Sequence, residues 1–188
     1  MGRWEPDARG RLERAALALY GERGFENTTV AEIAERAGLT ERTFFRYFTD
    51  KREVLFAGAG ALQDLLVNAV VEAPQSVTPI NAIAAALGAA AAVFDERRDY
   101  SVQRQTVIAA NSELHERELI KLATFASALA DALRRRGVTD PAAGLAAEAG
   151  IAVFKIAFEQ WTSETNRRDL SQLIRDSFDQ LKAVTTSA

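Results

Sequence analysis

Residues 25–51 read FENTTVAEIAERAGLTERTFFRYFTDK, and this stretch decides the fold. Thr29, followed three residues later by Glu32, makes a capping box, which marks the start of a helix. Apolar side chains then recur at the helical spacing i, i+3, i+4 and i+7, at Val30, Ile33, Ala34 and Ala37. Gly38 ends this helix, and Thr40 can cap a second short helix. Two short helices joined by a tight turn that contains glycine predict a helix-turn-helix.

A further helix is predicted on each side of this pair. Residues 9–23 place apolar side chains on one face, at Leu12, Ala16 and Leu19, and Gly24 follows as a C-terminal cap. Beyond the pair, Asp50 with Glu53 is expected to cap a fourth, long helix that runs to about Val71. The first fifty residues are therefore expected to form a three-helix domain.

The rest of the chain also follows helical patterns. Helices are predicted over residues 80–97, 99–111, 113–136, 140–161 and 169–183. In the fourth of these, Asp140 is the expected N-cap and Pro141 the first helical residue. Residues 74–79 are the best candidate for a linker and domain boundary. Strand-like alternation is missing from the sequence, and 11 glycines and 4 prolines leave few chain breakers, so the predicted fold class is all-α.

The composition excludes several kinds of site. The chain has no cysteine and one histidine, His115, which excludes disulfides, thiolate zinc sites, a cysteine nucleophile and a multi-histidine metal site. We therefore expect no metal and no cofactor. The net charge of −3 argues weakly against a nucleic-acid ligand, but the distribution of charge matters more than its total. Between residues 40 and 52 the cations Arg42, Arg46, Lys51 and Arg52 oppose only Glu41 and Asp50.

The sequence also carries an expectation about location. Residues 1–6 read MGRWEP and contain no apolar run, so we expect no secretory signal there. The longest apolar stretch, residues 82–94, is too short to span a bilayer. A cytoplasmic protein without a membrane partner is therefore expected.

The second helix of the pair carries groups that suit DNA. Its first turn follows the hydroxyl of Thr40 and holds Arg42, which can fork onto guanine, and Thr43, which can offer a methyl to thymine or a hydroxyl to a base edge. Typical phosphate partners surround them, namely Thr28, Thr29, Arg46, Tyr47 and Lys51. Phe44 and Phe48, by contrast, are expected to pack into the core rather than to stack on bases.

Residues 11–56 resemble the DNA-binding domain of the TetR family of bacterial repressors. The family pattern is a Thr-Thr or Thr-Val start, Ile-Ala-x-x-Ala-Gly, a hydroxyl residue, Thr-aromatic-aromatic-x-Tyr/His-Phe, and a lysine after the turn. Residues 28–51 match nearly every position. Two departures stand out: Arg42 replaces a frequent glycine and adds a group that can read bases or phosphates, and Phe45 replaces a frequent tyrosine. Phe45 keeps an aromatic platform against a sugar while losing one phosphate hydrogen bond.

The resemblance implies the organisation of the whole chain. TetR-like proteins are all-α homodimers that bind a palindromic DNA operator and are usually repressors. The implied division is a DNA-binding domain at residues 1–50 and a helical effector-binding and dimerisation domain at residues 51–188. Residues 103–161 resemble the subgroup with an acyl-CoA-like ligand, so the expected effector is small and apolar or amphipathic. Its binding would shift the two DNA-binding domains out of register.

Two sets of residues are candidates for these later roles. The candidate ligand-binding residues are Phe94, Gln103, Arg104, Phe125, Phe154, Lys155, Phe158 and Trp161. The alternatives are ordinary core packing for the aromatic residues, and for Lys155 a side chain that reaches solvent or crosses a dimer seam. The expected dimer faces are Ala147, Ile151, Phe154 and Phe158 with Leu173, Ile174, Phe178 and Leu181, which look too apolar for one monomer.

Two functions of other classes compete with a DNA-binding regulator. An enzyme would have to use the C-terminal helices, which lack a nucleophile–base pair, a phosphate-binding loop and metal-ligand spacing. A helical adaptor or ligand carrier could keep this architecture without binding DNA. The intact motif of residues 28–51 argues against a carrier.

Overall fold

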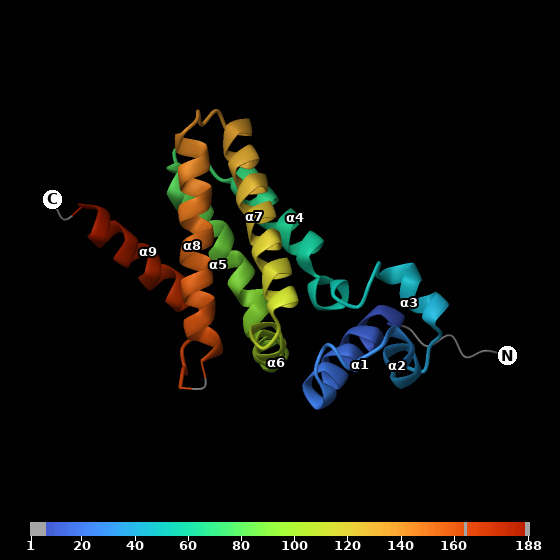
Figure 1. Ribbon diagram of the computed structural model, residues 1–188. Helices are drawn as coiled ribbons and strands as arrows, with labels where there is room; N and C mark the ends of the chain where they lie inside the picture. The colour runs from blue at the N-terminus through green and yellow to red at the C-terminus, as the bar shows by residue number, and fades with distance from the viewer. Residues whose placement is uncertain (1–6, 164, 187–188) are drawn as a thin grey trace. The chain divides into compact units, whose positions relative to one another are not determined.

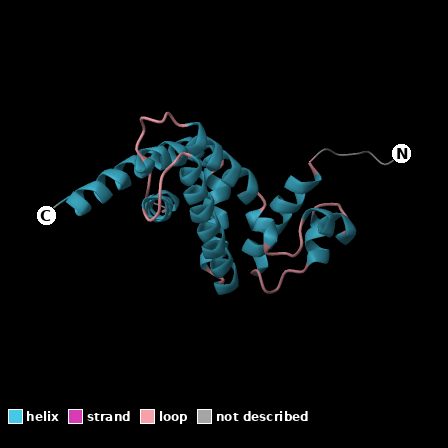
Figure 2. Ribbon diagram, turned by 90° about the horizontal axis from the view of Figure 1, so that it is seen from above, coloured by secondary structure: helices cyan, strands magenta, loops and turns pink. Residues whose placement is uncertain are grey.

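The computed structural model describes residues 7–163 and 165–186, and this part of the chain contains helices and loops without strands (Figures 1 and 2). The elements in chain order are α1 (Ala8–Arg23), α2 (Val30–Arg36), α3 (Glu41–Tyr47), the 3₁₀ turn η1 (Glu53–Phe56), α4 (Ala59–Glu72), α5 (Pro79–Asp95), α6 (Arg98–Ala109), α7 (Ser112–Arg135), α8 (Ala142–Thr162) and α9 (Leu170–Thr186). The all-α prediction is confirmed. The expectation about residues 1–6 lies outside the described residues.

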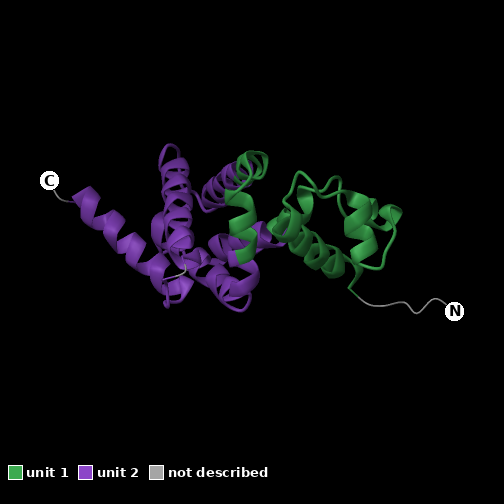
Figure 3. Cartoon of the chain, turned by 60° about the horizontal axis from the view of Figure 1, so that its bottom comes forward, with its two compact units in different colours: residues 1–59, 103–118 green, residues 60–102, 119–188 purple. Residues whose placement is uncertain are grey.

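The chain forms two compact units (Figure 3). The first consists of Met1–Ala59 together with Gln103–Glu118, and the second of Gly60–Val102 together with Leu119–Ala188. The predicted linker at residues 74–79 lies inside the second unit, where a short loop joins α4 to α5 and Pro79 already begins α5, so the chain does not divide there. The boundary between the units runs through α6 and α7 instead. The end of α6 and the start of α7 belong to the first unit, and the rest of both helices belongs to the second.

The helix-turn-helix of the first unit has the predicted caps. The Thr29 hydroxyl accepts from the Glu32 amide, and the Glu32 carboxylate accepts from the Thr29 amide at 2.8 Å, so both halves of the capping box form. The Thr40 hydroxyl accepts from the Thr43 amide and begins α3. Gly38 lies between the two helices with φ of +65°. This left-handed conformation is unfavourable for residues that carry a Cβ atom, so glycine suits the position. The helices close over a core of Leu12, Leu19, Ile33 and Phe44.

The predicted long fourth helix is interrupted. The Asp50 carboxylate does accept from the amides of Arg52 and Glu53, as expected of a cap. The chain then makes the 3₁₀ turn η1, and α4 begins only at Ala59. Two causes act together: Val54, Leu55 and Phe56 are consecutive and all buried, and Gly58 and Gly60 follow, with the lowest helix propensity of any residue except proline.

Residues Glu53–Glu72 are long and apolar enough to cross a membrane by length and composition, and 28% of an apolar 18-residue segment within them is buried. The sequence expectation considered only residues 82–94 and missed it. The bent pair formed by α5 and α6 passes the same test only if both helices are taken as one span. The break between η1 and α4 and the ion pair that Glu53 makes with Arg117 fit this stretch poorly to a bilayer.

In the second unit α5, α8 and α9 pack against one another. The contact between α5 and α8 is close because both helices present small residues. A Cβ atom at Gly150 of α8 would lie 2.2 Å from Ile83 Cγ2 of α5, so this crossing requires glycine. At the other end of α5, the Asp95 carboxylate accepts from the amide of Leu170 and holds the first turn of α9.

The predicted start of α8 is wrong by one position. The helix begins at Ala142, Pro141 is its N-cap residue rather than its first helical residue, and Pro141 follows a cis peptide bond. The carboxylate of Asp140 forms a bidentate pair with Arg134, at 2.9 and 3.1 Å. The Arg134 guanidinium holds the pKa of Asp140 below its ordinary value. The Asp140 carboxylate thus pairs with the end of α7 and still accepts from the Gly144 amide in the first turn of α8.

The apolar faces assigned to a dimer are covered within the chain. Ala147, Ile151, Phe154, Phe158, Leu173, Ile174 and Phe178 are all buried, and only Leu181 is half-buried. The sequence predicts an excess of apolar surface because it does not show that α8 and α9 pack on each other and on α5. The outer face of α8 carries different apolar residues in the open, Leu145 and Ile156, which are 66% and 50% exposed.

Candidate nucleic-acid interface

Helix α3 is held by its inner face and leaves its outer face open. Phe44 and Phe48 are buried, and their ring centroids lie 5.4 Å apart. On the opposite side Phe45 is 54% and Tyr47 42% exposed, although both are large aromatic residues. We call the outer residues the reading surface; it consists of Thr40, Arg42, Thr43, Phe45, Arg46 and Tyr47. Burying two of the four aromatic residues fixes the orientation in which the reading surface is presented.

Some side chains of the reading surface are held by hydrogen bonds within the chain, whereas Arg42 is not. The hydroxyls of Thr40 and Thr43 lie 3.1 Å apart and bond to each other, which orients the Thr43 methyl. Arg46 donates to the Tyr47 hydroxyl at 3.3 Å, and its guanidinium lies 4.9 Å from the Tyr47 ring. Arg42 is exposed and forms no hydrogen bond or ion pair within the described part of the chain. An exposed guanidinium without a partner, beside preorganised hydroxyl, phenol and cation groups, suits the phosphates and base edges of DNA.

Two predicted phosphate contacts turn inward instead. Thr28 is 1% exposed, and its hydroxyl donates to the Gly24 carbonyl at 2.9 Å. The Lys51 ammonium donates to the carbonyls of Phe25 and Thr28, at 2.8 and 3.0 Å. The carbonyls at the end of α1 and in the loop after it carry partial negative charge, which attracts a hydroxyl and a cation. Side-chain contacts from Thr28 and Lys51 to phosphate are therefore corrected to roles in holding this loop.

Thr29 lies apart from the reading surface, at the start of α2. Its hydroxyl donates to the Glu32 carboxylate at 2.9 Å, and the residue is exposed. That bond leaves an oxygen lone pair but no free proton for a phosphate. Six of the nine predicted DNA contacts thus gather on α3, two hold the loop before α2, and Thr29 is mainly a cap.

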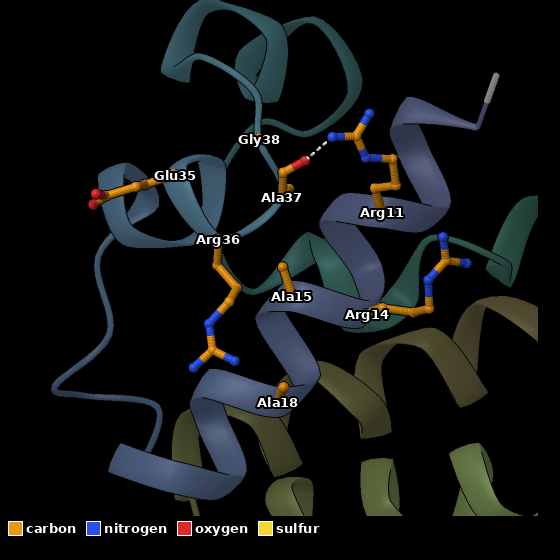
Figure 4. Close-up of a pocket in the computed structure, with 8 residues that line it drawn as sticks. All are labelled: Arg11, Arg14, Ala15, Ala18, Glu35, Arg36, Ala37 and Gly38. Carbon is orange, nitrogen blue, oxygen red and sulfur yellow. Dashed lines mark hydrogen bonds between the residues drawn. The ribbon is translucent and has the colours of Figure 1, made fainter. Parts of the chain in front are cut away.

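Arg11 of α1 supports the turn between α2 and α3, and the sequence analysis missed it. Its guanidinium donates to the Ala37 carbonyl at the end of α2, beside Gly38 (Figure 4). This contact lies in an open hollow of about 500 Å³, lined by Arg11, Arg14, Ala15, Ala18, Glu35, Arg36, Ala37 and Gly38. Arg14 pairs with Asp7, and Arg36 pairs with Glu22. The Arg11 contact in this hollow therefore stabilises the turn between α2 and α3. A local sequence pattern does not reveal the contact, because Arg11 and Ala37 are 26 positions apart.

The predicted ligand-binding residues fall in different units. Gln103 and Arg104 belong to the first unit, and the remaining six belong to the second. Four aromatic residues of the second unit do form a cluster, with neighbouring ring centroids 5.4–6.5 Å apart: Phe94, Phe154, Phe158 and Trp161. Trp161 is fully buried, and its indole N–H has no hydrogen-bond partner in the described part of the chain.

The two cationic candidates lie elsewhere. Lys155 is exposed on α8, outside the aromatic cluster. Arg104 donates to the Leu55 carbonyl at 2.7 Å and pairs with Glu118. The contacts of Arg104 thus lie inside the first unit, and its predicted role in ligand binding stays a prediction. Among the described residues no group of three histidine, aspartate or glutamate side chains could hold a metal ion.

Comparison with known proteins identifies the family. The model for bacterial regulatory proteins of the tetR family matches residues 13–57, and the model for the MftR C-terminal domain matches residues 77–186, more than half of the chain. The chain belongs to the TetR family. Its match to the HTH-type transcriptional regulator TcmR of Streptomyces glaucescens is 37% identical over 48% of this chain and 39% of TcmR. This protein thus spans well under half the length of TcmR, and the match to HbdR of Aromatoleum sp. likewise covers 42% of that relative.

Solved structures show the same fold over nearly the whole chain. FadR of Bacillus subtilis in complex with stearoyl-CoA superposes with a TM-score of 0.65 at 18% identity, over 92% of this TetR-family chain and 96% of FadR. SmeT, the repressor of a multidrug efflux pump of Stenotrophomonas maltophilia, superposes with a TM-score of 0.62 at 21% identity, over 94% and 89%. At these identities the likeness establishes the fold alone.

Proposed function

We propose that this TetR-family protein is a ligand-responsive transcriptional repressor that binds a palindromic operator as a homodimer. The observation that carries the proposal is α3: its aromatic inner face is buried, and its outer face presents Arg42 unpaired beside Thr43, Arg46 and Tyr47. An enzymatic role has no comparable support, because the relatives are transcriptional regulators. Operator binding places the protein in the cytoplasm, where bacterial DNA is.

The reading surface divides the work of recognition. Arg42, in the first turn of α3, reaches a guanine edge in the major groove, and the Thr43 methyl contacts a neighbouring thymine. Arg46 and Tyr47 bind phosphate and set the orientation of the helix, with Phe45 against a sugar. Two copies of α3 have to lie about 34–36 Å apart to enter successive major grooves, which requires a dimer. Leu145 and Ile156, exposed on α8, supply apolar surface for it.

The effector we propose is apolar or amphipathic and of the acyl-CoA kind. The aromatic cluster around Trp161 is apolar and largely buried, and it contains one N–H donor without a partner among the described residues. FadR of Bacillus subtilis has been solved with stearoyl-CoA, and SmeT with triclosan. Both ligands combine a large apolar body with polar groups, which fits a mostly apolar site with few donors.

A gel shift with the DNA immediately upstream of the gene tests the proposal. The wild type is compared, at two salt concentrations, with an Arg42→Ala/Thr43→Ala variant and with Arg135→Ala, which removes an exposed arginine from α7. We expect a shift by the wild type and by Arg135→Ala, none by the double variant, and a steep loss of affinity as salt rises. Equal shifts by all three proteins would contradict recognition through α3.

The same proteins also test the competing function, a ligand carrier, and the proposed homodimer. If the upstream DNA is not bound, selection from random oligonucleotides decides between a distant operator and a ligand carrier. An empty selection would favour the carrier. A monomeric mass in solution at working concentration would overturn the homodimer.

A further inference from the structure

A cation lies at the edge of the aromatic cluster. Helix α6 begins with Arg98 beside the end of α8, and the Arg98 guanidinium carbon lies 5.7 Å from the centroid of the Trp161 ring (Figure 1). The Trp161 side chain is fully buried, and its ring contacts those of Phe94 and Phe158. All four residues belong to the second unit. The apolar cluster therefore ends at a positive charge.

Arg98 uses only one of its three side-chain nitrogens within the described part of the chain. Nη2 donates to the carbonyls of Trp161 and Asn166, at 3.0 and 3.3 Å, and more weakly to that of Ser163, at 3.5 Å. Nε and Nη1 have no hydrogen-bond partner among the described residues, and solvent reaches both atoms. A guanidinium carries five N–H groups in a rigid fork, so the three on Nε and Nη1 remain available to a ligand.

The charge of Arg98 also lacks a counter-ion. Arg98 forms no ion pair with any described residue, whereas Arg104 and Arg134 each pair with a carboxylate. Asp95, three positions before Arg98, accepts from the Leu170 amide instead. Because Arg98 is half-buried and bonds only to neutral carbonyls, its positive charge is partly removed from water without compensation. An anion is the partner that would balance it.

The indole N–H of Trp161 is a second donor without an acceptor. It is buried, and no described atom accepts from it. Removing an N–H from water without a partner costs free energy, which an acceptor brought by a ligand would recover. Arg98 and Trp161 thus place a positive charge and a surplus of donors where the apolar cluster ends. That combination suits an oxyanion carried on an apolar body.

We propose that Arg98 binds the anionic group of the effector, which is therefore an amphiphile with a carboxylate or phosphate head. The inference rests on the proposed function, because it assigns the charge of the effector proposed there. The apolar body of the effector packs against the aromatic cluster, and its head lies at Arg98. A neutral apolar compound would leave the Arg98 charge uncompensated, and a site with polar donors discriminates against a ligand that lacks the matching group.

Isothermal titration calorimetry on the full chain tests this preference for charge. The probes are dodecanoate, lauroyl-CoA and 1-dodecanol, which share the same alkyl length and differ in the head. We expect the wild type to bind at least one of the two anionic probes about tenfold or more tightly than 1-dodecanol, because hydrogen bonds to an ionised group are stronger than those to a neutral one. The ratio of these two affinities is the charge preference.

Three variants separate the charge of Arg98 from the stability of the loop that it contacts. Arg98→Gln keeps an amide donor for the loop carbonyls but removes the charge, and it should lower the charge preference by about tenfold. Arg97→Gln removes the exposed neighbouring guanidinium, which solvent screens, and should change the preference by less than about twofold. Asn166→Ala removes the donor to the carbonyls of Trp161 and Arg168, so it loosens the same loop and keeps the charge. It should weaken the binding of all probes by one factor.

The charge preference is a ratio measured on one protein, so a loss of folded protein cancels from it. A fall in affinity confined to dodecanoate assigns a carboxylate head, and a fall confined to lauroyl-CoA assigns a phosphate. A wild-type charge preference in Arg98→Gln would overturn the proposal, and so would equal losses in Arg97→Gln and Arg98→Gln. A wild type that binds all three probes equally would overturn the role of Arg98 while keeping an apolar effector, whereas a wild type that binds none of them would count against both.

Discussion

Gly38 shows how a single residue sets the angle between α2 and α3. Its φ of +65° disfavours any side chain, and a Cβ there would lie 2.7 Å from Arg11 Nη2. We expect Gly38→Ala to lower the free energy of unfolding by about 1–2 kcal/mol, measured by urea denaturation. The matched control is Gly21→Ala in α1, where a Cβ meets nothing within 4 Å and should raise stability by about 0.5–1 kcal/mol. Equal changes in unfolding free energy for Gly38→Ala and Gly21→Ala would contradict the claim that a side chain at position 38 strains the turn.

Asp50 caps the start of η1, and its carboxyl group makes the stability of the folded state depend on pH. The Arg52 guanidinium, followed by the amides of Glu53 and Arg52, holds the pKa of Asp50 below its ordinary value of 3.8. A carboxyl group with a lowered pKa in the folded state stabilises that state above pH 3.8, and this contribution is lost as pH falls through the folded pKa. Asp50→Asn should therefore be less stable than wild type at pH 7, with a gap that closes at acid pH. In an Arg52→Met background the gap at pH 7 should be smaller, and an unchanged gap would contradict this account.

At the scale of helices, the crossing of α5 and α8 depends on Gly150. Gly150→Ala would push a Cβ into Ile83, and overpacking of this kind costs about 1–3 kcal/mol. Gly144→Ala on the same helix meets nothing within 4 Å and should be stabilising by about 0.5–1 kcal/mol. Thermal unfolding of the two variants gives the comparison directly. A stable Gly150→Ala protein would mean that α5 and α8 can separate without loss of packing.

At the scale of helices, the sequence predicts the caps that begin α2 and α3, but it does not predict contacts between residues far apart in the chain. The capping box at Thr29 and the cap at Thr40 depend on residues three positions apart, so the sequence contains everything needed to predict them. Arg11 beside Gly38, Lys51 turned toward Phe25, and Arg104 under η1 each depend on residues more than 25 positions away. The predicted dimer faces were wrong for the same reason, because α8 and α9 cover them by packing on each other and on α5.

At the scale of the molecule, the proposed function requires that effector and DNA oppose each other through the same protein. If stearoyl-CoA weakens DNA binding by a given factor, DNA must weaken stearoyl-CoA binding by that factor, because both are paths around one thermodynamic cycle. The chain has two tryptophans, so Trp4→Phe leaves Trp161 as the single reporter of ligand binding, and labelled DNA reports the other affinity. We expect equal factors of about 5–150, the usual range for coupled sites. Two affinities that do not change each other would mean that the aromatic cluster and the reading surface belong to independent activities, and the repressor mechanism would be wrong even if both ligands bind.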